Sequence, residues 1–197
     1  MKVMVTGCSG KIGTKVLKFL IESKIFCYGN SRKKVRFNFT KKYFKCCRND
    51  ILDKSFIIPE DTQILCHFAC EIYGSNKYSL KKNLEINKKI FHLIKRHNNL
   101  RKLIFMSSAS IYAARNVGKV NKKVRYLNTN NYALSKYYSE KMFLKFKHIK
   151  IYILRVPAVL CTGNEDNFIS NVIDKIKKNL QIRICNSENY FNNVILI

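Results

Sequence analysis

Residues that build flexible linkers are scarce in this sequence. Only seven glycines and two prolines occur among 197 residues, which argues against long disordered linkers. Long hydrophobic runs are also missing, since none approaches the roughly 18 residues of a membrane-spanning helix. Residues 1–6 have the character of a core strand, so no signal peptide is expected before them. We therefore expect a cytoplasmic protein without a membrane span, built as one domain or as one domain and the start of another.

Cysteine pairs with the spacing of a zinc or redox site do not occur. None of the eight cysteines belongs to a Cys-x-x-Cys motif, and most lie in apolar runs. Cys66 and Cys70 are four residues apart near the expected end of a strand, which is a poor geometry for sharing a metal ion. We expect reduced, buried thiols in a reducing compartment and no metal site.

Acidic residues are few, and this leaves the chain strongly basic. Twelve Asp and Glu face 38 Lys and Arg, which gives a net charge of +26. One interpretation is a polyanion partner, whose binding would weaken steeply with salt. The other is compositional drift, which we favour because the basic residues are spread along the chain without a known nucleic-acid-binding pattern. We expect no specific nucleic acid partner, although a basic surface attracts phosphorylated substrates.

Apolar runs alternate with segments of helical period along most of the chain. Strands that are apolar throughout and separated by helices predict a parallel sheet covered on both faces. The sequence therefore predicts a doubly wound α/β fold. The expected strands are residues 2–6, 25–29, 43–47, 62–69, 102–107 and 149–156, and the expected helices are residues 11–23, 76–97, 131–147 and 167–178.

A glycine-rich segment joins the first expected strand to the first expected helix. Gly7 permits a tight turn, Gly10 lets backbone amides approach a pyrophosphate, and Gly13 lets the helix pack closely on the strand. The amino end of a helix attracts phosphate groups through its free N–H groups and its dipole. The segment predicts a Rossmann fold with cofactor contacts from Gly7, Ser9, Gly10, Lys11, Ile12 and Gly13.

The residues after the second strand indicate which dinucleotide is bound. A carboxylate there accepts hydrogen bonds from the 2′-hydroxyl of NAD, whereas a basic residue accommodates the 2′-phosphate of NADP. Residues 28–33 contain no carboxylate, and Ser31 and Arg32 can both donate to a phosphate. The alternative is that Arg32 is one more surface cation of a very basic chain. The cofactor is expected to be NADP or NAD, with NADP favoured.

Tyr-x-x-x-Lys motifs place a phenol and an ammonium on one helix face. Four such motifs occur, starting at Tyr73, Tyr78, Tyr132 and Tyr137, and roughly one or two are expected by chance. Context therefore has to choose among them. Tyr132, with Lys136, follows a strand-end serine, Ser108, by 24 residues, and the resemblance described below makes this separation and the residues around Tyr132 the ones expected of a catalytic tyrosine. Tyr137 lies about one turn further along the helix and faces elsewhere.

The glycine spacing, the strand end at 102–112 and the segment 131–141 resemble the extended short-chain dehydrogenase/reductase family, which includes NAD(P)-dependent nucleotide-sugar epimerases and dehydratases. The resemblance covers about residues 1–165. It implies a catalytic set of Ser108, Tyr132 and Lys136. It also implies further cofactor contacts from Asp50, Ile51, Phe68, Ala69, Asn83, Tyr132 and Lys136.

The chemistry that this resemblance implies is hydride transfer assisted by proton transfer. Tyr132 would exchange a proton with a substrate hydroxyl or carbonyl, its pKa lowered by the Lys136 ammonium and the oxidised nicotinamide. Ser108 would hydrogen-bond the substrate oxygen, and Lys136 would hold the nicotinamide ribose. The implied substrate is a nucleotide-activated sugar. The implied partners also include a second copy of the chain, in a possible homodimer. The alternatives are an NADPH-dependent reductase of a keto-sugar or another small carbonyl compound, and a catalytically inactive NAD(P)-binding module.

Several positions depart from the family's pattern. Ala158 replaces an Asn that touches the nucleotide sugar, residues 119–125 are basic where a Glu is usual, and Cys70 replaces a small residue. After about residue 158 the alternation of strands and helices loosens, and the chain ends on an apolar run at 194–197. We expect residues 1–158 to form the NAD(P)-binding domain. Residues 159–197 would form an incomplete C-terminal substrate-binding portion.

Overall fold

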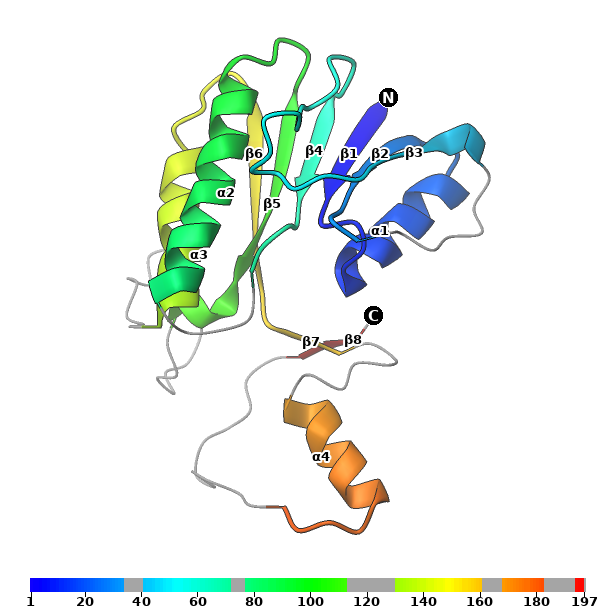
Figure 1. Cartoon of the computed structure of the whole chain (residues 1–197), viewed down its shortest axis with the longest axis vertical. Coiled ribbons are helices and arrows are strands. Elements are labelled where there is room, and N and C mark those ends of the chain that lie inside the picture. The colour runs from blue at the N-terminus through cyan, green and yellow to red at the C-terminus, as the bar shows by residue number, and fades with distance from the viewer. Residues whose placement is uncertain (34–40, 72–76, 113–129, 161–167, 183–193, 197) are drawn as a thin grey trace.

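Six parallel strands form one sheet at the centre of the protein (Figure 1). The computed structural model describes residues 1–33, 41–71, 77–112, 130–160, 168–182 and 194–196. The strand order β3-β2-β1-β4-β5-β6 confirms the doubly wound α/β fold, and each strand coincides with an expected apolar run. The strands are β1 (Lys2–Thr6), β2 (Phe26–Asn30), β3 (Phe44–Cys47), β4 (Ile64–His67), β5 (Lys102–Ser108) and β6 (Lys150–Val156).

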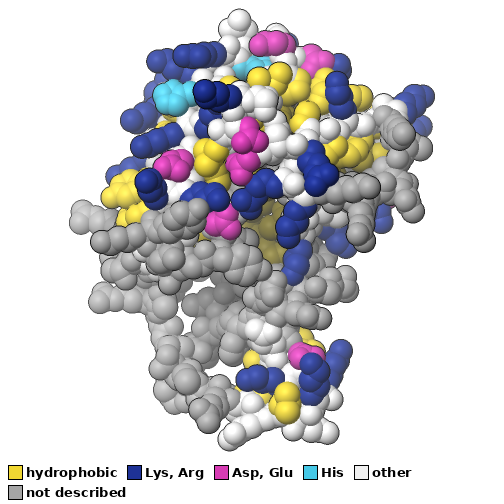
Figure 2. Space-filling view, in the orientation of Figure 1, with side chains coloured by type: hydrophobic (Ala, Val, Ile, Leu, Met, Phe, Trp, Pro, Cys, Tyr) yellow, Lys and Arg dark blue, Asp and Glu magenta, His cyan; other side chains and the backbone are white. Residues whose placement is uncertain are grey.

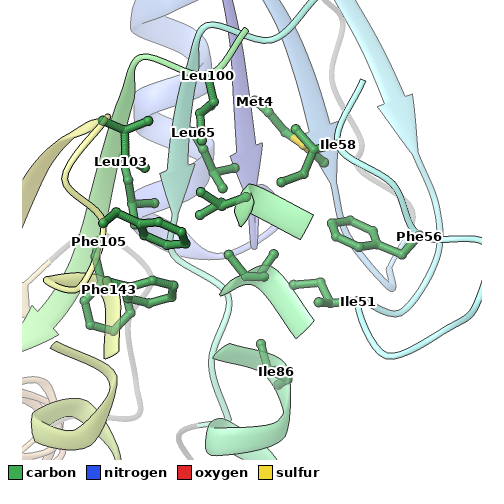
Figure 3. Close-up of a cluster of buried hydrophobic side chains, with 14 of the residues drawn as sticks. Met4, Ile51, Phe56, Ile58, Leu65, Ile86, Leu100, Leu103, Phe105 and Phe143 are labelled. Carbon is green, nitrogen blue, oxygen red and sulfur yellow. The ribbon is translucent and has the colours of Figure 1, made fainter. Parts of the chain in front are cut away.

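Alternate residues of β1 pack into two separate cores, because successive side chains of a strand point to opposite faces. Val3 and Val5 pack in a cluster with Leu17 of α1 (Lys11–Glu22). Met4 packs in a second cluster that contains residues of α2 (Lys77–Lys95) and α3 (Asn131–Phe143). Figure 3 shows this second cluster, in which side chains of β4 and β5 meet those of the two helices. The sheet is therefore covered on both faces, as the sequence predicts.

The helix α3 carries two of the predicted catalytic residues and begins directly after its N-cap residue, Asn130. The side chain of Asn130 accepts a hydrogen bond from the backbone N–H of Ala133 at 2.8 Å. The helix was expected to extend to residue 147 but ends at Phe143. Phe146 and Ile149 are nevertheless buried. They pack against the core from the turns that follow the helix, and this gives them a spacing that resembles a continued helix.

The segment after β6 forms a second, smaller sheet. Strand β7 (Ala158–Leu160), which the sequence did not indicate, pairs in parallel with β8 (Val194–Leu196). The helix α4 (Phe168–Lys177) coincides with the helix expected at 167–178. Exposed apolar side chains on this segment include Ile173 and Ile176.

The described cysteines are all free thiols, but they are not all buried. Cys8, Cys27 and Cys66 are buried as expected, whereas Cys46 is exposed and Cys47 and Cys70 are half-buried. The expectation of uniformly buried thiols is wrong for these three because β3 lies at the edge of the sheet and Cys70 lies beyond the end of β4. Cys161 and Cys185 lie outside the described residues.

On the face shown in Figure 2, charged side chains do not gather in one place. In the face shown in Figure 2, Lys and Arg side chains are spread over the whole described part, with the few acidic side chains among them. This distribution matches the even spread of basic residues along the sequence. Within the described ranges, no helix is long and apolar enough to cross a membrane.

Candidate functional site

A cleft of about 220 Å³ opens at the carboxyl ends of β1, β2 and β4. It lies where the connection from β1 leads to one side of the sheet and the connection from β4 leads to the other, which is where open α/β sheets bind ligands. Nine of the predicted cofactor-binding residues line it. The lining residues are Gly7, Ser9, Gly10, Asn30, Ser31, Arg32, Lys33, Asp50, Ile51, Phe68, Ala69, Cys70, Glu71 and Ile86.

The glycine loop has the close approaches that the sequence predicts. Gly7 has φ +68°, and a Cβ there would lie 2.8 Å from the backbone nitrogen of Ala69 at the end of β4. A Cβ at Gly13 would lie 2.3 Å from the carbonyl oxygen of Gly7, so this glycine lets α1 pack against the loop. Lys11 and Ile12 begin the helix but do not line the cleft.

The amino end of α1 is suited to a pyrophosphate. Gly10 is the N-cap residue and offers no side chain to the free N–H groups of the first turn, and that turn contains no acidic residue. A Cβ at Gly10 would meet only the carbonyl oxygen of Gly7, at 3.2 Å, so the space above Gly10 belongs to the cleft. The residues present therefore fit a dinucleotide.

Arg32 lies between two carboxylates that also line the cleft. Its guanidinium nitrogens are 3.8 Å from the Asp50 carboxylate and 3.5 Å from the Glu71 carboxylate. The sequence predicts Arg32 as a partner for a 2′-phosphate, but the structure pairs it with acidic residues from the ends of β3 and β4. Ser31 is buried, and its hydroxyl donates to the Ser9 hydroxyl at 2.6 Å.

Asn83 does not line the cleft, although the resemblance implied a cofactor contact there. Its side chain is buried and holds the backbone of Glu71 by two hydrogen bonds. The Glu71 N–H donates to Oδ1 of Asn83 at 2.8 Å, and Nδ2 of Asn83 donates to the Glu71 carbonyl at 2.9 Å. Asn83 therefore supports a cleft residue from behind.

The structure brings Ser108, Tyr132 and Lys136 together beside the carboxyl end of β5. The Lys136 ammonium is buried, lies 5.6 Å from the centre of the Tyr132 ring and donates to the Met106 carbonyl at 2.8 Å. Ser108 hydrogen-bonds the Tyr132 hydroxyl. The Ser108 hydroxyl is also 2.8 Å from the Ser110 hydroxyl.

Tyr137, the tyrosine of the neighbouring motif, lies in a different environment. Its ring packs against Tyr138 at 5.8 Å between centres, with the Lys141 ammonium 4.5 Å from its ring centre. Tyr73 lies outside the described residues, as does the side chain of Tyr78. Of the described candidates, Tyr132 is the one placed at the serine.

A sequence profile of the NAD-dependent epimerase/dehydratase family matches residues 3–190. The chain belongs to this family. Among curated proteins, no sequence matches it significantly.

Solved structures of related enzymes share the fold of this epimerase/dehydratase family member at low identity. UDP-glucose 4-epimerase of Thermotoga maritima, solved with UDP-glucose, is 17% identical with a TM-score of 0.80, over 100% of this chain and 69% of that one. UDP-glucuronic acid 4-epimerase of Bacillus cereus, solved with UDP-glucuronic acid and NAD, is 22% identical with a TM-score of 0.79, over 95% and 66%. The enzyme WbmH of Bordetella bronchiseptica, solved with NAD+, is 15% identical with a TM-score of 0.76, over 91% and 63%.

Burial and two neighbouring groups shift the pKa of Tyr132 in this family member. Burial raises the pKa of Tyr132, the neighbouring Cys70 thiol raises it further, and the hydrogen bond with Ser108 lowers it. The expected lowering of this pKa concerns the site with oxidised nicotinamide bound, whereas in the chain by itself burial outweighs the stabilisation of the phenolate. The Lys136 ammonium is directed at the Met106 carbonyl.

His67 is a buried residue of β4 that hydrogen-bonds to a side chain of β1 and a side chain of α2. Its Nδ1 lies 2.7 Å from the Thr6 hydroxyl, and its Nε2 lies 2.7 Å from Oδ1 of Asn87. Because Nδ2 of Asn87 donates to Ser139, Oδ1 must accept, which places the His67 proton on Nε2. Burial lowers the pKa of His67 to about 3, so the ring is neutral.

Five residues that line the cleft were not among the predicted cofactor-binding residues. They are Asn30, Lys33, Cys70, Glu71 and Ile86. Cys70 had been noted only as a departure from the family's pattern, and Glu71 carries no motif that could have indicated it. Among the described residues, no group of three or more His, Cys, Asp or Glu side chains could hold a metal ion.

Proposed function

We propose that this chain is the cofactor-binding part of an NAD-dependent epimerase or dehydratase that acts on a nucleotide-activated sugar. One observation carries the proposal: the glycine-loop cleft and the Ser108, Tyr132 and Lys136 cluster open at the same edge of one sheet. Membership of the family and the UDP-sugar complexes of the similar structures support it.

The proposal also assigns separate binding functions to two parts of the chain. Residues 1–158 would bind the dinucleotide, and residues 159–197 would begin the substrate-binding region. The chain spans 63% of the WbmH structure and 69% of the UDP-glucose 4-epimerase structure.

We propose NAD rather than NADP as the cofactor, in place of the preference drawn from the sequence. The similar structures whose cofactor is known hold NAD. In this chain, the Asp50 and Glu71 carboxylates neutralise Arg32, the cation that would have met a 2′-phosphate. A phosphate would also lie close to both carboxylates and be repelled by them.

In the proposed reaction, each residue of the cluster has a separate task. Bound nicotinamide would accept and return the hydride. Tyr132 would transfer the proton of the sugar hydroxyl, Ser108 would donate a hydrogen bond to the same oxygen, and Lys136 would stabilise the phenolate. Since the pKa of Tyr132 is raised in the chain by itself, this last task requires the ammonium to act on the phenol rather than on the Met106 carbonyl alone.

The raised pKa of Tyr132 favours a second candidate, a dinucleotide-binding module without turnover. A phenol that stays protonated is a poor general base at neutral pH. The two candidates share the cofactor and differ only in chemistry, so one experiment can separate them.

The experiment begins with the purified full chain. Mass spectrometry would identify any co-purifying dinucleotide, and calorimetry would measure NAD+ affinity of the wild type and of Gly10→Val. The variant should keep the fold but lose most of its affinity, because the valine side chain would occupy the pyrophosphate's space. Absence of NAD+ binding to a folded wild type would overturn the proposal.

The second step supplies NAD+ with UDP-glucose or UDP-glucuronic acid and follows inversion at the sugar C4 by NMR. Inversion without net consumption of the cofactor supports an epimerase, whereas consumption of NADPH with a keto-sugar would indicate a reductase. Tight NAD+ binding with no conversion of any sugar would leave the binding module as the function of this chain.

A further inference from the structure

The carboxylate that is missing after β2 is present on the opposite wall of the cleft. Glu71 follows β4 and lines the same cleft as Ser31 and Arg32, which follow β2. Because β1 lies between β2 and β4 in the sheet, these two walls face each other across the glycine loop. The Glu71 carboxylate lies 3.5 Å from the Arg32 guanidinium.

The position of Glu71 is fixed by a buried residue. Both polar atoms of the Asn83 side chain, which is 1% exposed, are bonded to the backbone of Glu71. The Lys82 ammonium lies 3.8 Å from the same carboxylate. Because the backbone of Glu71 is held by Asn83 and its carboxylate is paired with Lys82, the negative charge stays at one position in the cleft.

The four ion-paired side chains balance one another in charge. Arg32 and Lys82 are positive, Asp50 and Glu71 are negative, and each cation lies within 4 Å of a carboxylate. Lys33, which also lines the cleft, adds one further positive charge. The Arg32 guanidinium is ion-paired with the two carboxylates, whereas the recognition of a phosphate requires its donors to be available for the phosphate oxygens. A dianionic phosphate added here would face two carboxylates at close range.

We propose that Glu71 selects NAD over NADP in this chain, by engaging Arg32 and excluding a 2′-phosphate from the adenosine end of the cleft. The inference rests on the proposed function, since it concerns the cofactor of that site. In Rossmann folds, a residue after β2 usually discriminates between NAD and NADP, whereas here the proposal gives this function to a residue after β4. Asp50 assists on the other side of the guanidinium.

The test is the ratio of NAD+ and NADP+ dissociation constants, measured by calorimetry at one ionic strength. Glu71→Gln keeps the size of the side chain and removes its charge. It should shift the ratio toward NADP+ by roughly tenfold or more, the size expected from one charge-assisted hydrogen bond between the Arg32 guanidinium and the 2′-phosphate. Glu85→Gln removes the same charge from an exposed position of α2 and should leave the ratio within about twofold of wild type.

A second substitution identifies the mechanism. Arg32→Ala in the Glu71→Gln background should abolish most of the gained NADP+ affinity, because the freed guanidinium is what would bind the phosphate. The inference is overturned if wild type prefers NADP+, if Glu71→Gln leaves the ratio unchanged while NAD+ still binds, or if the gain survives the loss of Arg32. Binding of neither dinucleotide to folded wild type would instead overturn the proposed function itself, and the inference with it.

Discussion

Arg155 forms a two-point ion pair with Glu140, whose carboxylate is almost fully buried. Nε of Arg155 donates to Oε1 of Glu140 at 2.9 Å, and Nη2 donates to Oε2 at 2.6 Å. The Ser107 hydroxyl donates to the same carboxylate. Nη1 of Arg155 also donates to the Tyr112 hydroxyl at 2.8 Å. The pair therefore joins β5, β6 and α3.

This ion pair lies directly behind the candidate catalytic cluster. Glu140 is one helical turn after Lys136, and Ser107 immediately precedes Ser108. The position of α3 relative to β5 thus depends on Glu140 being paired. The hydrogen bond to Glu140 raises the pKa of Arg155, so the guanidinium remains charged.

Removing Arg155 should destabilise the fold substantially. Arg155→Met leaves the Glu140 carboxylate buried without its partner, and the expected loss of unfolding free energy is about 3–5 kcal/mol, measured by urea denaturation. Lys18→Met breaks an exposed pair with Glu22 and serves as the control, with an expected loss below about 1 kcal/mol. Equal losses of unfolding free energy in the two variants would show that the buried ion pair stabilises the fold no more than the exposed one does.

Tyr132→Phe should abolish most of the turnover of a complete active site while leaving cofactor affinity nearly unchanged. The substitution keeps the ring's packing and removes the oxygen that transfers the proton, so the rate should fall by roughly 10²–10⁴. Tyr137→Phe should remain within a few-fold of wild type, since its ring packs against Tyr138. The measurement is single-turnover hydride transfer followed by nicotinamide absorbance. Loss of transfer in Tyr137→Phe, with activity retained in Tyr132→Phe, would contradict the assignment.

Cys70 should control the pH at which Tyr132 ionises. The thiol raises the pKa of Tyr132, so Cys70→Ala should shift the ionisation of this phenol to lower pH. The titration is read from the phenolate absorbance, as the difference between each protein and its Tyr132→Phe counterpart. Cys47→Ala, which changes a half-buried thiol on β3, is the control and should leave the titration where it is. An unshifted titration in Cys70→Ala would show that burial alone sets this pKa.

His67 should make the fold sensitive to acid. Burial lowers the pKa of His67 from 6.5 to about 3, so between these values the unfolded chain binds a proton that the folded chain does not. Its contribution to stability is therefore complete above pH 6.5 and is lost as the pH falls toward 3. The slope is about 1.4 kcal/mol per pH unit.

The comparison that isolates this effect is His67→Gln. Urea denaturation of both proteins at several pH values between 7 and 4 should show a shallower decline of the unfolding free energy in the variant. The variant will be less stable at neutral pH, because it loses a buried hydrogen-bonded ring. Parallel declines in the two proteins would exclude His67 as the source of the acid sensitivity.

The sequence by itself determined the six strands of the central sheet, the glycine loop and the choice of Tyr132 as the candidate catalytic tyrosine. These features depend on local patterns: an apolar run predicts a buried strand, three glycines predict close backbone contacts, and a strand-end serine marks one tyrosine among four. In each case, the residues that carry the signal are neighbours along the chain or belong to one element and the next. The end of α3 at Phe143 was predicted too late in the sequence, because buried residues in turns can have the same spacing along the chain as buried residues of a helix.

Only the tertiary structure decided the partners of charged and polar side chains. Arg32 looked like a phosphate ligand until the ends of β3 and β4 placed Asp50 and Glu71 beside it. The pKa of Tyr132 in the chain by itself is raised by burial and by Cys70, which the sequence pattern around Tyr132 did not indicate. Such contacts join residues far apart in the sequence. They follow from which strands lie side by side and how deeply each group is buried, and neither property is written in a local pattern.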